Sequence, residues 1–176
     1  MQIKELELEG TYVIEPSLLS DNRGYFTRIF CKYEFSRLGL VTDFPQWSIS
    51  HNNHKNTIRG MHYQKTPHEE IKLVTCIKGE IYDVLVDLRK SSKTYKKWTG
   101  IELTEKNRKS LYIPKGIAHG FKTLSDDTDV LYHISEFYCP EFNTGVLYND
   151  TAFGIDWGDL KDIVISERDL AWSKFN

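Results

Sequence analysis

The sequence predicts an all-β fold of the sandwich or barrel class, with a few short helices. Short runs of β-branched and aromatic residues recur along the chain, and aromatic residues make up 13% of it. Pairs of turn-forming residues separate these runs, at Asp21-Asn22, Lys78-Gly79, Asp126-Asp127 and Asn149-Asp150. Many short strands at close spacing are typical of β-sandwiches and barrels.

The elements follow from local pattern. The segment 80–88, EIYDVLVDL, mixes apolar and polar positions as a half-buried strand does. Further strands are expected at 71–77, 98–103, 110–114, 129–138 and 144–150. Helices are expected only at 31–39, which ends at a glycine, and as a C-terminal turn at 166–172.

Length and composition limit the class of protein. A chain of 176 residues is expected to form one domain, residues 1–176, with a sizeable core. A net charge of −2 gives no basis for binding nucleic acid or a membrane surface. The N-terminus does not resemble a signal peptide, and no apolar run is long enough to span a bilayer. Three scattered cysteines without a CxxC pair suit a reducing, cytoplasmic location.

Two of the six histidines lie in dense local patterns. His62 belongs to RGMHYQ (59–64), and His119 belongs to IPKGIAHGF (113–121), whereas His51, His54 and His68 lie in polar segments that we expect to be exposed. Histidine serves both as a proton-transfer group near neutral pH and as a metal ligand. A buried structural role, a metal site and a general base are therefore the three hypotheses for His62.

The metal hypothesis lacks ligands. The pattern P-x-G-x-x-H at 114–119 resembles the second motif of the cupins, which fold as a double-stranded β-helix, and it predicts a tight turn before His119. Metal-binding cupins also carry an H-x-H pair, but Gln64 stands two residues after His62. Zinc and iron sites commonly take three protein ligands, so we expect no metal here.

Acid–base chemistry without a metal needs a base oriented by a carboxylate and a proton donor opposite it. Asp83, Asp87 and Asp169 are candidates for the carboxylate, and Tyr132 and Tyr138 for the donor. Spacing alone does not choose among them.

Several blocks, in order along most of the chain, resemble the dTDP-4-dehydrorhamnose 3,5-epimerase family of cupin-fold enzymes. The matching stretches are DNRGYF (21–26), IRGMHYQ (58–64), 72–100, LYIPKGIAHGF (111–121), VLYHISEFYCPE (130–141), NDTAFGIDW (149–157) and ISERD (165–169). The resemblance implies a cupin-type jelly-roll barrel. It also implies an epimerase without a cofactor, which inverts C3, C5 or both in a nucleotide-linked 4-keto-6-deoxyhexose through an enolate, in the biosynthesis of deoxysugars for cell-surface polysaccharides.

The resemblance also implies catalytic roles for four residues. His62 matches the base, Asp169 its carboxylate partner, and Tyr132 the proton donor on the opposite face of the sugar. Lys72 matches the cation that stabilises the enolate oxygen. Taken singly, each of these residues also has an ordinary structural explanation, such as a surface charge, a core aromatic or a helix cap.

Substrate-binding positions are implied in the same way. Arg59 and Gln46 match diphosphate contacts, and His119 matches a pocket residue near the sugar. Phe137 stands where the family often stacks a tyrosine on the base. Arg23 and Phe26 match positions that reach the nucleotide of a neighbouring subunit, so a homodimer is expected.

The chain departs from the family pattern at two positions. Ser48 replaces an asparagine in QWSIS (46–50), and a hydroxyl can still bind a phosphate or sugar oxygen. Arg28 replaces a glutamate that is common in the dTDP-sugar enzymes. Thymine presents an N3–H donor and cytosine an N3 acceptor, so Arg28 opens the alternative of a CDP-linked sugar.

Two functions of other classes stay open at this point: a metal-dependent cupin enzyme, and a sugar-nucleotide binding module without activity. The epimerase hypothesis also makes a structural demand, because Arg59 and His62 must face the same substrate. An odd separation on a regular strand puts side chains on opposite faces, so we expect a turn or bulge near Gly60.

Overall fold

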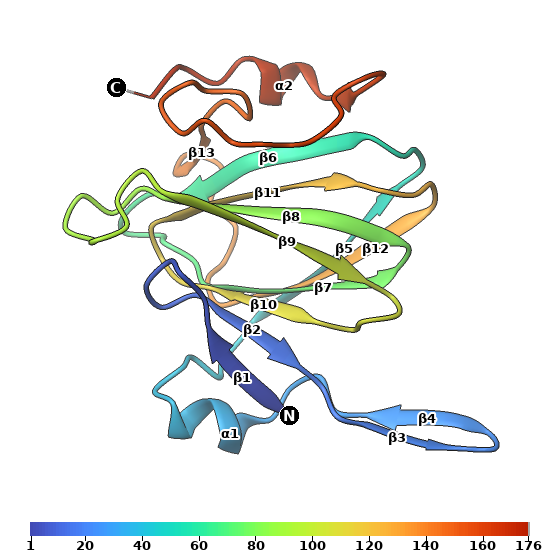
Figure 1. Ribbon diagram of the computed structural model, residues 1–176. Helices are drawn as coiled ribbons and strands as arrows, with labels where there is room; N and C mark the ends of the chain where they lie inside the picture. The colour runs from blue at the N-terminus through green and yellow to red at the C-terminus, as the bar shows by residue number, and fades with distance from the viewer. Residues whose placement is uncertain (176) are drawn as a thin grey trace.

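The computed structural model describes residues 1–175 and shows two antiparallel sheets packed face to face as a jelly-roll barrel (Figure 1). One sheet contains six strands in the order β1 (Gln2–Glu5), β2 (Tyr12–Glu15), β10 (Ser110–Ile113), β7 (Lys72–Lys78), β12 (Thr128–Ile134) and β5 (Gln46–Asn52). The expected all-β fold with a few short helices is confirmed.

The second sheet follows the order β13 (Asn143–Gly145), β6 (Thr57–Gln64), β11 (Ile117–Thr123), β8 (Glu80–Asp87) and β9 (Trp98–Thr104). A short strand, β14 (Val164–Ile165), pairs in parallel with β6. The helices are α1 (Lys32–Arg37) and α2 (Glu167–Leu170). None of the helices in residues 1–175 is long and apolar enough to cross a membrane.

The main core lies between the sheets. On β8, Ile81 and Leu85 point into it, while Val84 and Val86 point to the opposite face, as the alternation along a strand requires. Inward positions on β8 and β11 also include Asp83 and His119, which are both buried. The core is therefore largely apolar, and Asp83 and His119 are polar exceptions within it.

Two further clusters cover the outer faces of the sheets. Phe35 of α1 packs with Ile14, Leu73 and Tyr112 against the first sheet. The C-terminal segment covers the second sheet, where Trp157 joins a cluster with residues of β6, β8 and β11 (Figure 1). The C-terminal segment thereby places α2 in contact with β6. Side chains of α2 can then reach the open end of the barrel.

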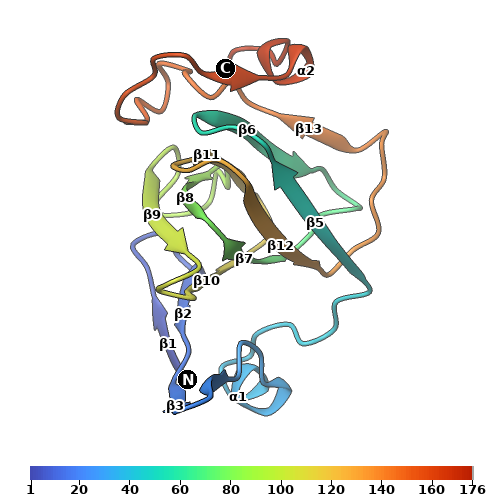
Figure 2. The same cartoon turned by 90° about the vertical axis from the view of Figure 1, so that its right-hand side faces the viewer.

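A hairpin of β3 (Leu18–Asp21) and β4 (Gly24–Thr27) projects from the body of the molecule (Figures 1 and 2). Leu19 and Phe26 are each 68% exposed on it. Large apolar side chains on an isolated two-stranded arm have no core of their own to join. The hairpin is thus an apolar surface without a covering within residues 1–175.

The expected strands in 71–77, 80–88, 98–103 and 110–114 are confirmed within a residue or two of their ends. The strand expected over 129–138 is shorter and ends at Ile134, with one further backbone bond from the Ser135 N–H to the Ile71 carbonyl oxygen. The strand expected over 144–150 ends at Gly145, because Leu147 and Asp150 form a turn. The turn expected before His119 is present, with Gly116 at φ +79°, and the strand β11 follows it.

Candidate active site

A bulge on β6 brings Arg59 and His62 to the same side of the sheet. His62 pairs with His119 and Arg59 pairs with Phe121, so Gly60 and Met61 stand opposite the single residue Gly120. The φ of Gly60 is +144°, and a Cβ there would lie 2.5 Å from the Gly120 Cα atom. Only glycine fits this position. The bulge expected from the spacing of Arg59 and His62 is confirmed.

His62 is paired with Asp169. The His62 Nε2 atom lies 2.6 Å from Asp169 Oδ1, and the other carboxylate oxygen accepts the Gly60 N–H at 3.2 Å. The short helix α2 holds the aspartate in place, because the Ser166 hydroxyl accepts the Asp169 N–H at 3.1 Å and caps the helix. The capped helix and the bulge therefore both hold the Asp169 carboxylate, which contacts the His62 imidazole.

The carboxyl group of this pair favours its ionised form. Burial disfavours the charged form of Asp169, but hydrogen bonds from His62 and Gly60 and the nearby His62 charge outweigh it and lower the carboxyl pKa. An ionised Asp169 accepts the Nε2 proton of His62, so the tautomer leaves the lone pair on Nδ1. That nitrogen is the atom available to take a proton.

A second pair lies one strand away. His119 Nε2 is 2.9 Å from Asp83 Oδ2, and the other oxygen of Asp83 is buried with no hydrogen-bond partner in residues 1–175. Burial raises the pKa of Asp83, although the neighbouring His119 and Lys72 oppose this. The His119 ring meets Tyr132 edge to face with centroids 6.0 Å apart. His119 therefore lies beside the tyrosine, with Asp83 paired to its Nε2 atom.

Tyr132 is held in its neutral form. Burial, followed by the charge of Asp83, raises the pKa of the phenol above its ordinary value, despite the opposing charge of Arg59. A phenol of raised pKa keeps its proton at neutral pH and can donate it to a stronger base such as an enolate.

These groups open into one cavity of about 350 Å³. Seven residues singled out from the sequence line it: Ser48, Arg59, His62, Lys72, His119, Tyr132 and Tyr138. The volume lies at the lower end of small-molecule sites, so it suits a single sugar ring better than a whole sugar nucleotide.

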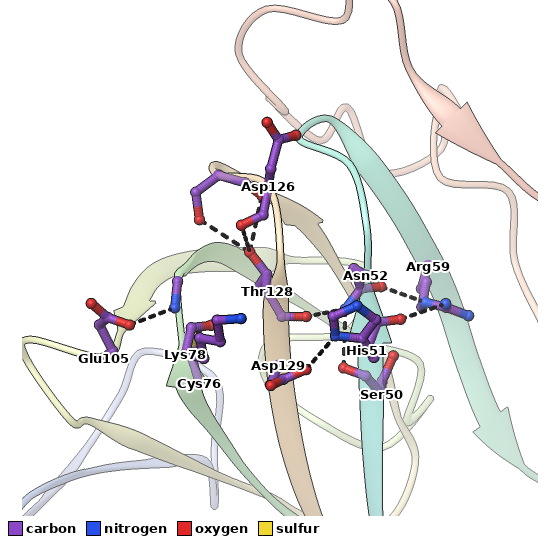
Figure 3. A network of polar contacts seen from close by, with 12 residues as sticks. Ser50, His51, Asn52, Arg59, Cys76, Lys78, Glu105, Asp126, Thr128 and Asp129 are labelled. Atoms are coloured by element: carbon purple, nitrogen blue, oxygen red, sulfur yellow. Dashed lines mark hydrogen bonds and ion pairs between the residues drawn. The ribbon is translucent and has the colours of Figure 1, made fainter.

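The guanidinium of Arg59 is oriented by neutral groups (Figure 3). Its Nε donates to the Asn52 side-chain oxygen at 2.7 Å, and Nη2 donates to the His51 carbonyl oxygen at 3.3 Å. Asn52 is held in turn by donating to the carbonyl oxygens of Ser50 and Thr128, each at 3.1 Å. Because neither acceptor is charged, Arg59 keeps its positive charge for an anion.

Three of the expected binding residues lie on the projecting hairpin, away from this cavity. Arg23 donates to the Asp21 carboxylate, and Phe26 is largely exposed. Arg28 directly follows β4, and its Nη1 atom lies 3.9 Å from Glu34 Oε1. Two others are near the cavity but are not part of its lining. The Gln46 side-chain oxygen accepts the Tyr138 N–H at 2.7 Å, and Phe137 is 62% exposed.

The structure adds residues that the sequence analysis missed. Glu70, Asn143 and Arg168 also line the cavity. Arg168 directly precedes Asp169 in the ISERD motif, so this neighbouring position could have identified it as a site residue from the sequence. Glu70 lies two residues before Lys72, in a segment that reads as an ordinary charged loop. Only the folded chain brings it to the cavity.

The three candidate carboxylates have separate partners. Asp169 meets His62 and Asp83 meets His119, whereas Asp87 accepts hydrogen bonds from Arg89, Ser92 and Thr94 far along β8. Within residues 1–175, no group of three His, Cys, Asp or Glu side chains is arranged to hold a metal ion.

The family model of dTDP-4-dehydrorhamnose 3,5-epimerase matches residues 5–176. The chain belongs to this family. A dTDP-4-dehydrorhamnose 3,5-epimerase from Methanothermobacter thermautotrophicus is 43% identical over 94% of this chain and 89% of its own length. As a member of the dTDP-4-dehydrorhamnose 3,5-epimerase family, the protein is an isomerase.

Solved structures of a dTDP-4-dehydrorhamnose 3,5-epimerase and of a dTDP-6-deoxy-D-glucose-3,5-epimerase share the fold. The enzyme from Bacillus anthracis, with TDP and PPi bound, superposes with a TM-score of 0.95 at 38% identity, over 99% of both chains. The Legionella pneumophila enzyme RmlC, in complex with dTDP-4-keto-L-rhamnose, gives a TM-score of 0.92 at 34% identity over 98% of this chain and 92% of its own. The family and the cupin-type fold expected from the sequence are confirmed.

Proposed function

We propose that this protein is a cofactor-independent epimerase of a dTDP-linked 4-keto-6-deoxyhexose, in deoxysugar biosynthesis. One observation carries the proposal: the His62–Asp169 pair, with its 2.6 Å contact, opens into the same cavity as Tyr132 and Lys72. A base, an acid and a cation around a space of sugar size are the groups that epimerisation next to a ketone requires.

The chemistry follows from the substrate. A ketone at C4 acidifies the C–H bonds at C3 and C5. His62 takes one of these protons at Nδ1, and the resulting imidazolium is stabilised by Asp169. The electron pair moves to the C4 oxygen as an enolate, which the Lys72 ammonium stabilises. Tyr132 then returns a proton to the opposite face of the ring, and the configuration inverts without a redox step.

The rest of the substrate is oriented by charge. Arg59 and Arg168 line the cavity with Ser48 and supply guanidinium groups for the diphosphate. Gln46, on the same strand as Ser48, is a further diphosphate contact in this proposal. His119 contacts the sugar, and Phe137 is exposed for stacking on the base. The diphosphate thereby places the sugar ring against His62.

A homodimer is part of this proposal. Arg23 and Phe26 lie on the projecting hairpin, remote from the cavity of their own chain, and are suited to reach the nucleotide of a second copy. The edge strand β5 also exposes Trp47 at 68% and Ile49 at 62%. Apolar side chains on an unpaired sheet edge favour association with another chain. The mass of the particle in solution, measured by light scattering, tests this.

The preference for thymine or cytosine as the nucleobase depends on Arg28. This residue lies 3.9 Å from Glu34, so a carboxylate stands beside the arginine that replaces the family glutamate. A glutamate there can accept the N3–H of thymine, which supports dTDP over CDP. Turnover of the dTDP- and CDP-linked 4-keto-6-deoxyglucose substrates, compared side by side, decides between the two nucleotides.

The functions of other classes gain no support. A metal-dependent enzyme commonly needs three protein ligands, and within residues 1–175 no three His, Cys, Asp or Glu side chains are arranged to supply them. A binding module without activity does not require a base, an acid and a cation around one cavity. We also propose that residues 1–176 act as one domain and that the protein is cytoplasmic, since its three cysteines are free thiols.

Incubation with dTDP-4-keto-6-deoxyglucose in D2O tests the central proposal. Deuterium at C3 and C5, measured separately by NMR, is the expected result, and it reports which carbons are inverted. The variant His62→Asn should abolish incorporation at both positions. If the unaltered protein incorporates deuterium at neither carbon from either nucleotide sugar, it is not an epimerase of this class.

A further inference from the structure

The cavity contains a carboxylate that the proposed chemistry does not use. Glu70 precedes β7, and its Oε1 atom lies 2.8 Å from the Lys72 Nζ atom. The side chains are only 10% and 11% exposed, and both line the cavity with His62 and Tyr132. Within residues 1–175, Lys72 is the only cation whose nitrogen lies within 4.0 Å of the Glu70 carboxylate.

A lysine in this position needs an anchor. Its ammonium is carried on a flexible four-carbon stem, and fixing such a side chain costs conformational entropy. Burying the charge without a partner is also unfavourable. Glu70 addresses both requirements, because it pairs the charge and defines where the nitrogen lies. The ammonium has three N–H donors, so two are left for a substrate oxygen.

The carboxylate has no evident use of its own in the reaction. A negative charge close to a developing enolate raises the energy of that enolate. Glu70 is therefore useful only if it acts through Lys72. The other cations of the cavity, two arginines, are held differently. Arg59 donates to Asn52, and the Arg168 Cζ atom lies 5.6 Å from the centre of the Trp172 ring.

We propose that Glu70 is a positioning residue that holds the Lys72 ammonium at the place where the C4 enolate oxygen forms. This inference rests on the proposed function. It concerns the rate of proton abstraction rather than binding of the nucleotide, since the diphosphate is bound by the arginines. Loss of Glu70 should thus lower kcat and leave KM nearly unchanged.

A double-mutant cycle tests the inference. The variants Glu70→Gln and Glu70→Ala are prepared alone and in a Lys72→Met background, with Glu69→Gln and Glu69→Ala as controls that change the same net charge one residue away. The readouts are kcat, KM and the rate of deuterium incorporation from D2O, with thermal unfolding to verify the fold. A pairwise effect that acts through Lys72 must vanish when Lys72 is absent.

Glu70→Ala should lower kcat by about 10- to 100-fold with KM within about threefold, the scale expected when a catalytic group is misplaced. Glu70→Gln should recover part of this loss, because an amide oxygen still accepts from the ammonium. In the Lys72→Met background, either change should alter kcat less than about twofold. If Glu70→Ala fails to fold, the isosteric Glu70→Gln cycle decides.

Two results overturn the inference. One is a fall in kcat of equal size with and without Lys72, which would mean that Glu70 acts on the substrate or the fold directly. The other is an effect of Glu70→Ala no larger than that of Glu69→Ala. Deuterium incorporation by the unaltered protein is measured first, so failure of the proposed function is recognised separately.

Discussion

The Nε2 atom of His62 lies 2.6 Å from the Oδ1 atom of Asp169, although 107 residues separate them in the chain. The imidazole lies on a central strand of the second sheet, and the carboxylate lies on a four-residue helix of the C-terminal segment. Their contact therefore depends on how the last part of the chain crosses β6.

The variant Asp169→Asn should lose activity while keeping its shape. An amide at this position no longer selects the Nε2–H tautomer or stabilises the imidazolium, and a comparable change in a serine protease costs about 10⁴-fold in kcat. We expect a loss of at least about 10³-fold, measured by steady-state kinetics. Asp43→Asn, at an exposed position, is the control. Retention of activity within tenfold would contradict the role of Asp169.

The variant Tyr132→Phe should separate proton exchange from inversion. His62 can still remove a proton and return a deuteron from the same face, whereas the opposite face has lost its donor. In D2O the substrate should gain deuterium with its configuration retained. Tyr138→Phe, the other tyrosine of the cavity, should still invert. If Tyr138→Phe stops inversion and Tyr132→Phe does not, the donor has been assigned to the wrong tyrosine.

The variant Asn52→Asp should weaken substrate binding through Arg59. Asn52 is 2% exposed and accepts from the Arg59 Nε, so a carboxylate there would neutralise the guanidinium that we assign to the diphosphate. KM should rise about tenfold with kcat nearly unchanged, the size of one charge-assisted hydrogen bond. Asn53→Asp introduces the same charge at an exposed neighbour. An equal effect in both variants would exclude a specific role for Asn52.

Asp87 should stabilise the fold in a pH-dependent way. Burial opposes its ionisation, but hydrogen bonds from Arg89, Ser92 and Thr94 outweigh this and lower the pKa from 3.8 to about 2. The unfolded chain thus binds this proton at higher pH than the folded chain does. The stabilisation is fully present above about pH 4 and is lost as the pH falls towards 2.

This stabilisation is on the order of 2 kcal/mol at neutral pH. The free energy of unfolding, measured in urea between pH 7 and pH 2.5, should be lower for Asp87→Asn at neutral pH, and the difference should shrink as acid is added. Asp43→Asn again serves as the control. A difference that does not change with pH would mean that ionisation of Asp87 is not the cause.

Gly60→Ala should disrupt the bulge that places Arg59 and His62 together. The added Cβ would lie 2.5 Å from the Gly120 Cα atom, and φ is +144°. Gly24 is a matched control, because its φ is +135° but nothing lies within 4 Å of an added Cβ. Gly24→Ala should cost about 1 kcal/mol in unfolding free energy, and Gly60→Ala about 3 kcal/mol or more. Equal costs would mean that the close approach to Gly120 relaxes easily.

Local pattern accounts for several strands of the core. Residues 71–77 and 80–88 are confirmed because their apolar alternation coincides with burial on the two sides of a sheet. The motif around His119 also predicted its turn. The edge strands β1 and β5 were missed, since burial on one side only leaves weaker apolar signals. The buried strands β6 and β11 were missed as well, because polar residues and glycine interrupt their apolar pattern.

By itself, the sequence determined the fold class, the family and a short list of reactive residues, because residue types and their order along the chain carry that information. Spacing alone left three carboxylates open as the partner of His62, the family resemblance implied Asp169, and neither pointed to Glu70. Only the tertiary structure decided these points. The His62–Asp169 contact depends on how segments 107 residues apart pack together. The Glu70–Lys72 contact depends on the direction of two side chains that are near in sequence, and packing of the barrel brings both to the cavity.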